Sequence, residues 1–137
     1  HATAVAAHGR GIQPFHYMVA LAGGHDIRCA PYATFGTQEL SELAITALEG
    51  RKACLLANHG VIATGANLAA ALALAVQVEE LAQQYLAALA RGAPLLLSAQ
   101  QMDEVLAKIN LVGYGASSAP TTSDEPGLEA EVLNLDR

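Results

Sequence analysis

The sequence is poor in the residues on which several common functions depend. It has no tryptophan, two cysteines, and charged side chains at only 15% of its positions. Cys29 and Cys54 form neither a CxxC motif nor a disulfide framework. This usage is typical of a reducing compartment, so we expect a cytoplasmic protein with both thiols buried. Because lysine and arginine nowhere cluster among aromatic residues, we expect no nucleic-acid partner.

Long uninterrupted apolar runs are absent as well. The richest segment, 68–90, is broken by polar and acidic side chains, whereas a membrane-spanning helix needs about 20 consecutive apolar residues. We therefore expect that the protein does not enter a membrane. Hydrophobic residues still make up 53% of the 137 positions, and this length and composition predict one domain with a substantial core.

Three segments carry the apolar repeat of a helix, and each follows a residue type that caps helix N-termini. They are 38–48 after Thr37, 68–90 after Asn67, and a helix to about residue 109 after the capping box of Ser98 and Gln101. The alanine-rich segment 1–7 is typical of the end of a further helix, because glycines follow it.

Four short segments carry the aromatic and β-branched residues that favour strands. They are 15–20, 27–30, 53–57 and 61–64. Neither a regular βαβ spacing nor a glycine-rich phosphate loop accompanies them. We therefore expect an α/β layer fold whose sheet need not be parallel.

The end of the chain differs in composition from the rest. Five carboxylates and one arginine beyond residue 115 supply −4 of the formal net charge of −6. This part also contains prolines, serines and threonines, which is typical of a segment without a packed core. We expect a folded domain over 1–115 and an acidic, flexible tail over 116–137.

His59 is the histidine whose surroundings suggest chemistry. It lies in ANHGVIATG (57–65), between two strand-like segments that would hold its backbone rigid, and Gly60 leaves space beside the ring. Neutral imidazole is the commonest protein ligand of zinc, but zinc needs two further ligands, and no HxH or HExxH pair occurs nearby. From the residues alone, His59 is either a metal ligand or a hydrogen-bonded structural residue.

Two tyrosines are candidates for proton transfer. Tyr17 lies in the strand-like segment 15–20, and Tyr114 lies between two glycines. A rigidly held phenol can donate a proton to a developing oxyanion. The other interpretation of each is a packing residue with a satisfied hydroxyl. We expect Tyr32 to anchor a loop and Tyr85 to lie in the core.

Residues 16–65 closely resemble the central region of the class II aldolase and adducin family. The resemblance rests on APYATFGT (30–37) combined with the NHG turn (58–60). It continues through VEELAQQYL (78–86) to about residue 110. It therefore covers most of the chain apart from the tail.

This resemblance implies a fold and a metal site. The fold is an α/β, three-layer domain in which helices flank a mainly antiparallel sheet, and its N-terminal part would be missing from this chain. The metal is Zn²⁺, held by three histidines. His59 matches the histidine of the NHG turn, and the other two would form an HxH pair upstream of residue 1, together with an acid/base glutamate.

The implied activity is zinc-dependent cleavage of a sugar phosphate, a ketose 1-phosphate similar to L-fuculose 1-phosphate, to dihydroxyacetone phosphate and an aldehyde. Members form homotetramers with active sites between subunits. Tyr17 matches a tyrosine that reaches the neighbouring subunit's site, and Tyr114 resembles a C-terminal active-site tyrosine. Related sugar-phosphate epimerases, decarboxylases and dehydratases, or a non-catalytic adducin-like scaffold, are the alternatives. The 137 residues alone are expected to be inactive.

Overall fold

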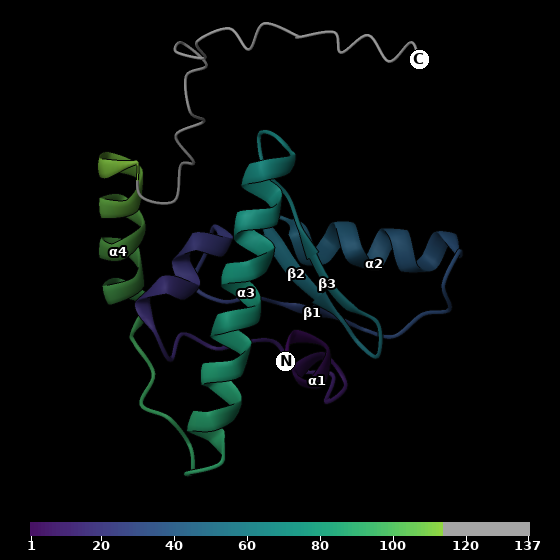
Figure 1. The fold of residues 1–137 in the computed structure, drawn as a ribbon, viewed down its shortest axis with the longest axis horizontal. Helices are drawn as coiled ribbons and strands as arrows, with labels where there is room; N and C mark the ends of the chain where they lie inside the picture. The colour runs from purple at the N-terminus through teal and green to yellow at the C-terminus, as the bar shows by residue number, and fades with distance from the viewer. Residues whose placement is uncertain (114–137) are drawn as a thin grey trace, which may run out of the picture.

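A computed structural model describes residues 1–113 of the chain, drawn in Figure 1. It contains four α-helices, one 3₁₀ helix and three short strands in this part. In chain order they are α1 (Ala2–Ala6), η1 (Tyr17–Ala22), β1 (Cys29–Ala30), α2 (Gln38–Leu48), β2 (Ala53–Leu56), β3 (Gly60–Ala63), α3 (Leu68–Leu89) and α4 (Ala99–Val112).

The three strands form one sheet in the order β1-β2-β3. β2 and β3 form an antiparallel hairpin in which Leu56 faces Gly60, and β1 runs parallel to β2 with Ala30 facing Leu56. The antiparallel pairing is the longer of the two. Since β1, α2 and β2 follow one another, the parallel pair also makes one βαβ unit, which the sequence spacing did not predict.

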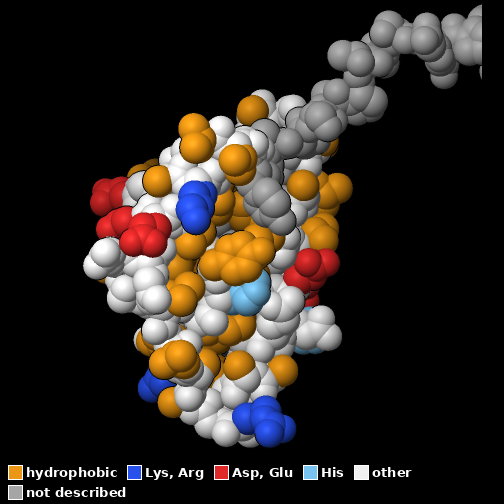
Figure 2. Space-filling model, turned by 90° about the vertical axis from the view of Figure 1, so that its left-hand side faces the viewer, with side chains coloured by type: hydrophobic (Ala, Val, Ile, Leu, Met, Phe, Trp, Pro, Cys, Tyr) orange, Lys and Arg blue, Asp and Glu red, His pale blue; other side chains and the backbone are white. Residues whose placement is uncertain are grey.

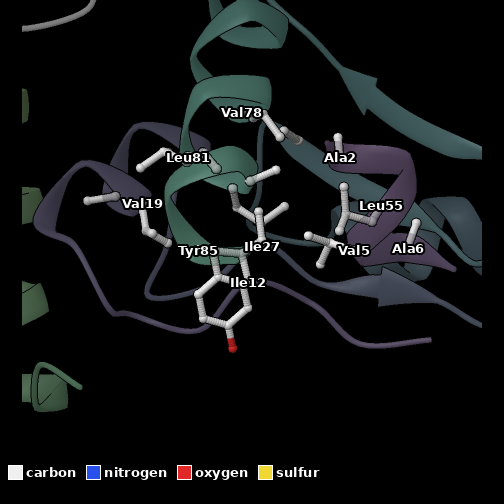
Figure 3. Close-up of a cluster of buried hydrophobic side chains, with 14 of the residues drawn as sticks. Ala2, Val5, Ala6, Ile12, Val19, Ile27, Leu55, Val78, Leu81 and Tyr85 are labelled. Carbon is white, nitrogen blue, oxygen red and sulfur yellow. The ribbon is translucent and has the colours of Figure 1, made fainter. Parts of the chain in front are cut away.

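Helices cover both faces of this sheet, which confirms the predicted α/β layer fold. α2 packs on one face, over a small cluster centred on Ala30, Ala47 and Cys54. α1 and α3 pack on the other face, over the larger cluster shown in Figure 3, to which β2 contributes Leu55. Tyr85 of α3 is buried there, as predicted, and its hydroxyl donates to Gln13 Oε1 at 3.3 Å.

The helix caps agree with the predictions. The side chain of Thr37 accepts from Leu40 N–H, and that of Asn67 accepts from Ala70 N–H. Ser98 and Gln101 form the full capping box. Each cap satisfies a backbone donor that has no partner inside its helix, and this is why the three helices begin where the sequence indicates.

The predicted strand over 15–20 is wrong, because Tyr17–Ala22 forms the 3₁₀ helix η1. His16 caps it through Nδ1, which accepts from Met18 N–H at 3.3 Å, and Gly23 ends it with φ 94°. Val19 and Ala22, three residues apart, are both buried, as suits the three-residue turn of this helix. The packing of η1 against α3 and α4 therefore outweighs the strand propensity of its aromatic and β-branched residues.

The two cysteines differ in burial. Cys54 in β2 is fully buried, and burial together with the neighbouring Cys29 thiol raises the pKa of its own thiol to about 11. Cys29 is half-buried, and burial raises its pKa as well. The prediction of buried thiols is thus confirmed for Cys54 and only in part for Cys29. Within residues 1–113, no helix is long and apolar enough to cross a membrane.

Candidate functional site

His59 lies in the tight turn that joins β2 to β3. Asn58 before it adopts the left-handed conformation with φ 59°, and Gly60 after it has φ 152°. Asparagine and glycine are the residues that tolerate such backbone best. The N–H of His59 donates to Leu56 O at 3.0 Å and closes the turn. The hairpin therefore fixes the backbone from which the imidazole projects, as the sequence predicts.

The parallel pairing of β1 with β2 brings a second segment to the same place. The carboxyl ends of parallel strands lie at one edge of a sheet, and here Ala57 N–H donates to Ala30 O at 3.0 Å just beyond the strands. The loop 31–33 after β1 consequently lies beside the turn 57–59. Figure 1 shows the end of β1 next to the hairpin turn.

This loop makes two contacts with the His59 ring. Nε2 lies 2.8 Å from Ala33 O, and since a carbonyl oxygen only accepts, the proton of the ring is on Nε2. In the neutral imidazole, Nδ1 then keeps its lone pair. The Tyr32 ring stacks on the imidazole, with centroids 5.3 Å apart and planes 6° apart. His59 is therefore held at one edge and over one face.

The start of the chain also lies against the turn. A Cβ placed on Gly60 would come within 3.5 Å of Thr3 Oγ1, so α1 packs directly on the residue after His59. Glu79 of α3 anchors the start of α1, because its carboxylate accepts from Ala2 N–H at 2.8 Å.

The described residues do not by themselves form a zinc site. Within residues 1–113, no group of three or more histidine, cysteine, aspartate or glutamate side chains is arranged to hold a metal. A catalytic zinc needs three protein ligands. His59 fits as one such ligand, by its donor chemistry and by its fixed position, and its neighbours in this part of the chain add none.

Tyr17 and His59 come from separate elements of the fold. Tyr17 is the first residue of η1, it is 47% exposed, and its ring contacts His16 with centroids 4.8 Å apart. In Figure 1, η1 lies on the α4 side of α3, and the hairpin turn lies on the other side. One chain therefore does not bring Tyr17 to His59. Tyr114, the other tyrosine predicted from the sequence, lies outside the described residues.

A cavity of about 590 Å³ opens elsewhere, between the N-terminal part of α3 and the C-terminal part of α4. Lys52, Asn67, Leu74 and Ile109 are among its lining residues, and none of the lining residues belongs to the His59 turn. Figure 2 shows the face that bears η1 and α4, where hydrophobic side chains lie exposed among a few charged ones. The cavity and the candidate metal ligand are thus separate features.

Sequence reasoning missed the neighbours of His59. The sequence predicts Tyr32 only as a loop anchor, and it gives no direct signal for the contributions of Ala33 O and Glu79. The one indirect signal for the loop contacts is the short strand-like segment 27–30, which Pro31 follows. If this segment pairs parallel to 53–57, residues 32 and 33 lie beside the turn that holds His59. The direction of that pairing cannot be read from so short a strand.

Comparisons with known proteins agree with this architecture. A sequence model of the Class II Aldolase and Adducin N-terminal domain matches residues 1–86. The 5-methylthioribulose-1-phosphate/5-deoxyribulose-1-phosphate aldolase of Rhodospirillum rubrum is 58% identical over 114 residues, which are 83% of this chain and 52% of the relative. The L-fuculose phosphate aldolase of Escherichia coli K12 is 53% identical over 114 residues, 82% of this chain and 53% of the relative.

A solved structure is similar too. A structure of L-fuculose 1-phosphate aldolase superimposes with a TM-score of 0.76 at 41% identity, over 80% of this chain and 51% of that one. The chain thus spans about half the length of the curated relatives it matches. The predicted fold, part of a class II aldolase-like domain, is confirmed. From its sequence and its architecture, the chain belongs to the class II aldolase and adducin family.

Proposed function

We propose that the protein is a class II sugar-phosphate aldolase that cleaves a ketose 1-phosphate to dihydroxyacetone phosphate and an aldehyde. The observation that carries this proposal is the identity of 58% and 53% to two such aldolases over the same length of 114 residues. The local structure supports it, because a turn fixed on both sides presents the one histidine that matches the family's metal ligand.

His59 is the proposed ligand to zinc. The other two histidines would come from a part of the protein outside these 137 residues, in keeping with the twofold greater length of the relatives. α1 would help to assemble them, since it packs on Gly60 and Glu79 holds its first turn. Zinc bound there would supply a Lewis acid that polarises the hydroxyketone oxygens of the substrate.

Tyr17 is the proposed proton donor to the aldehyde oxygen, and Tyr114 a second active-site tyrosine. The exposed position of Tyr17, on the far side of α3 from His59, suits a residue that serves the active site of a neighbouring subunit. The proposed assembly is therefore a homotetramer with active sites between subunits. We also propose a cytoplasmic location, a domain that ends near residue 115, and an acidic tail beyond it.

The substrate class is a ketose 1-phosphate. The relatives include aldolases for L-fuculose phosphate and for 5-methylthioribulose and 5-deoxyribulose 1-phosphates. These substrates share the end that becomes dihydroxyacetone phosphate and differ at the aldehyde end. The shared end is the part that zinc and its ligands would contact. The proposal therefore covers the common reaction and leaves the choice of aldehyde to the assay.

The test uses the protein at its natural length. Zinc content per subunit is measured, together with cleavage of L-fuculose 1-phosphate, 5-deoxyribulose 1-phosphate and 5-methylthioribulose 1-phosphate, by the release of dihydroxyacetone phosphate. We expect bound zinc and cleavage of at least one substrate. Epimerisation of a pentulose 5-phosphate without cleavage would assign the protein to a related enzyme class, and the absence of both zinc and turnover would indicate a scaffold.

A further inference from the structure

We propose that Tyr32 is a positioning residue that fixes the plane of the His59 imidazole. This inference rests on the proposed function, since it concerns the residue that would bind the metal. It goes further because it assigns a role in orienting His59 to Tyr32, which the sequence predicts only as a loop anchor. The inference stands on the stacking of the two rings, with planes 6° apart.

A single hydrogen bond leaves the imidazole one freedom of movement. The bond from Nε2 to Ala33 O holds one corner of the ring at 2.8 Å, but the ring can still tilt about its Cβ–Cγ bond while this contact is kept. A flat group parallel to the ring removes this rotation. The Tyr32 ring occupies that position, with its centroid 5.3 Å from that of the imidazole.

Core packing does not explain the position of Tyr32. Its side chain is 57% exposed, so burial contributes little to holding it over the histidine. Its backbone is placed instead by the sheet: Ala57 N–H donates to Ala30 O, and Pro31, whose own φ is fixed by its ring, leads into Tyr32. Tyr32 and Ala33, two consecutive residues, therefore constrain a face and an edge of the same ring.

The consequence is preorganisation. A histidine that occupies one orientation before a ligand arrives loses less side-chain entropy on binding than a freely rotating one. Tyr32 itself need not touch the substrate or the metal. Its effect would pass through His59 alone.

The test compares Tyr32→Ala, Tyr32→Leu and Tyr32→Phe in the protein at its natural length, without metal, by NMR of the carbon-bound ring protons of His59. In the wild type, the stacked tyrosine should displace these protons upfield and give cross-relaxation between the two rings. We expect loss of both signatures in the Ala and Leu variants and their retention in the Phe variant, which keeps the ring without the hydroxyl.

Phe35→Ala serves as the control, because Phe35 is a more exposed aromatic residue in the same loop and should leave the His59 signals unchanged. The proposal would be overturned if the His59 ring protons of the wild type show no upfield displacement. It would also be overturned if their chemical shifts are the same in Tyr32→Ala as in the wild type. Loss of the signature in Tyr32→Phe would assign the effect to the hydroxyl and overturn it too. The experiment requires neither metal nor turnover, so an absence of aldolase activity would leave its result intact.

Discussion

His59 and Tyr17, the two candidate site residues that the structure describes, are held in different ways. His59 projects from a hairpin turn, and a carbonyl group and an aromatic ring from the loop after β1 contact its imidazole. Tyr17 begins a 3₁₀ helix, is 47% exposed, and contacts the ring of its own neighbour His16. One side chain is oriented within its own chain, whereas the other is open to a partner. This difference is the one expected if, as proposed, Tyr17 serves the active site of a neighbouring subunit.

Replacing His59 by alanine should have the largest effect. In the protein at its natural length, loss of one of three ligands should abolish zinc binding, as measured by the zinc content of purified protein. His8→Ala provides a control, because His8 is an exposed histidine outside the turn and should keep the metal. Equal zinc content in the wild type and the His59 variant would contradict the assignment of this ligand.

Tyr17→Phe should slow turnover by about 100-fold and leave zinc in place, because it removes only a proton donor. Mixing Tyr17→Phe subunits with His59→Ala subunits sharpens the comparison. If each active site combines Tyr17 of one subunit with His59 of the next, random hybrid tetramers restore about a quarter of the sites. Hybrids that stay as inactive as the two parents would show that both residues belong to the same subunit's site.

Asn58→Val tests the rigidity of the turn. A β-branched residue at φ 59° should destabilise the fold by about 1–2 kcal/mol, as measured by urea unfolding of the chain. Asn58→Gly is the matched control, since glycine accepts this conformation with little cost. A valine variant as stable as the wild type would mean that the turn relaxes, and that His59 is no more constrained than Tyr17.

Replacing Cys54 by alanine should have the smallest effect, and this variant tests the packing of β2, the strand that leads to His59. The folded pKa of the Cys54 thiol, about 11, lies above the reference value of 9.0, so the unfolded thiol ionises first as the pH rises. The stability that this difference contributes is fully present below pH 9 and is lost as the pH rises towards 11. In Cys54→Ala, the free energy of unfolding, measured with urea, should fall less steeply as the pH rises. An equally steep decline in this variant would show that the thiol is accessible.

The sequence predicts the elements with strong local signals and misses those that depend on distant contacts. Thr37, Asn67 and Ser98 locate three helices because a cap is a local hydrogen bond. The sequence also predicts the two strand-like segments on either side of His59, and the structure joins them by a tight turn that Asn58 and Gly60 suit. The strand predicted over 15–20 is wrong because the aromatic residues there favour a strand, whereas packing against α3 and α4 selects a 3₁₀ helix over Tyr17–Ala22.

The parallel β1–β2 pair could not be predicted, and it determines the surroundings of His59. The β1 strand is only two residues long, which is too short for periodicity to reveal its direction. The contacts of Tyr32 and Ala33 with the imidazole follow from that pairing. The sequence could thus identify the candidate ligand, while its neighbours required the tertiary structure.

The same pairing sets an order of events during folding. The β2–β3 hairpin joins residues that are close in sequence and can form within microseconds. The β1–β2 pair must first close a loop that contains the whole of α2, and such non-local contacts form more slowly. His59 would therefore exist on its turn before Tyr32 and Ala33 arrive to orient it. In a newly made chain, the turn that carries His59 would therefore form early. The imidazole would take its final orientation only when β1 has paired with β2.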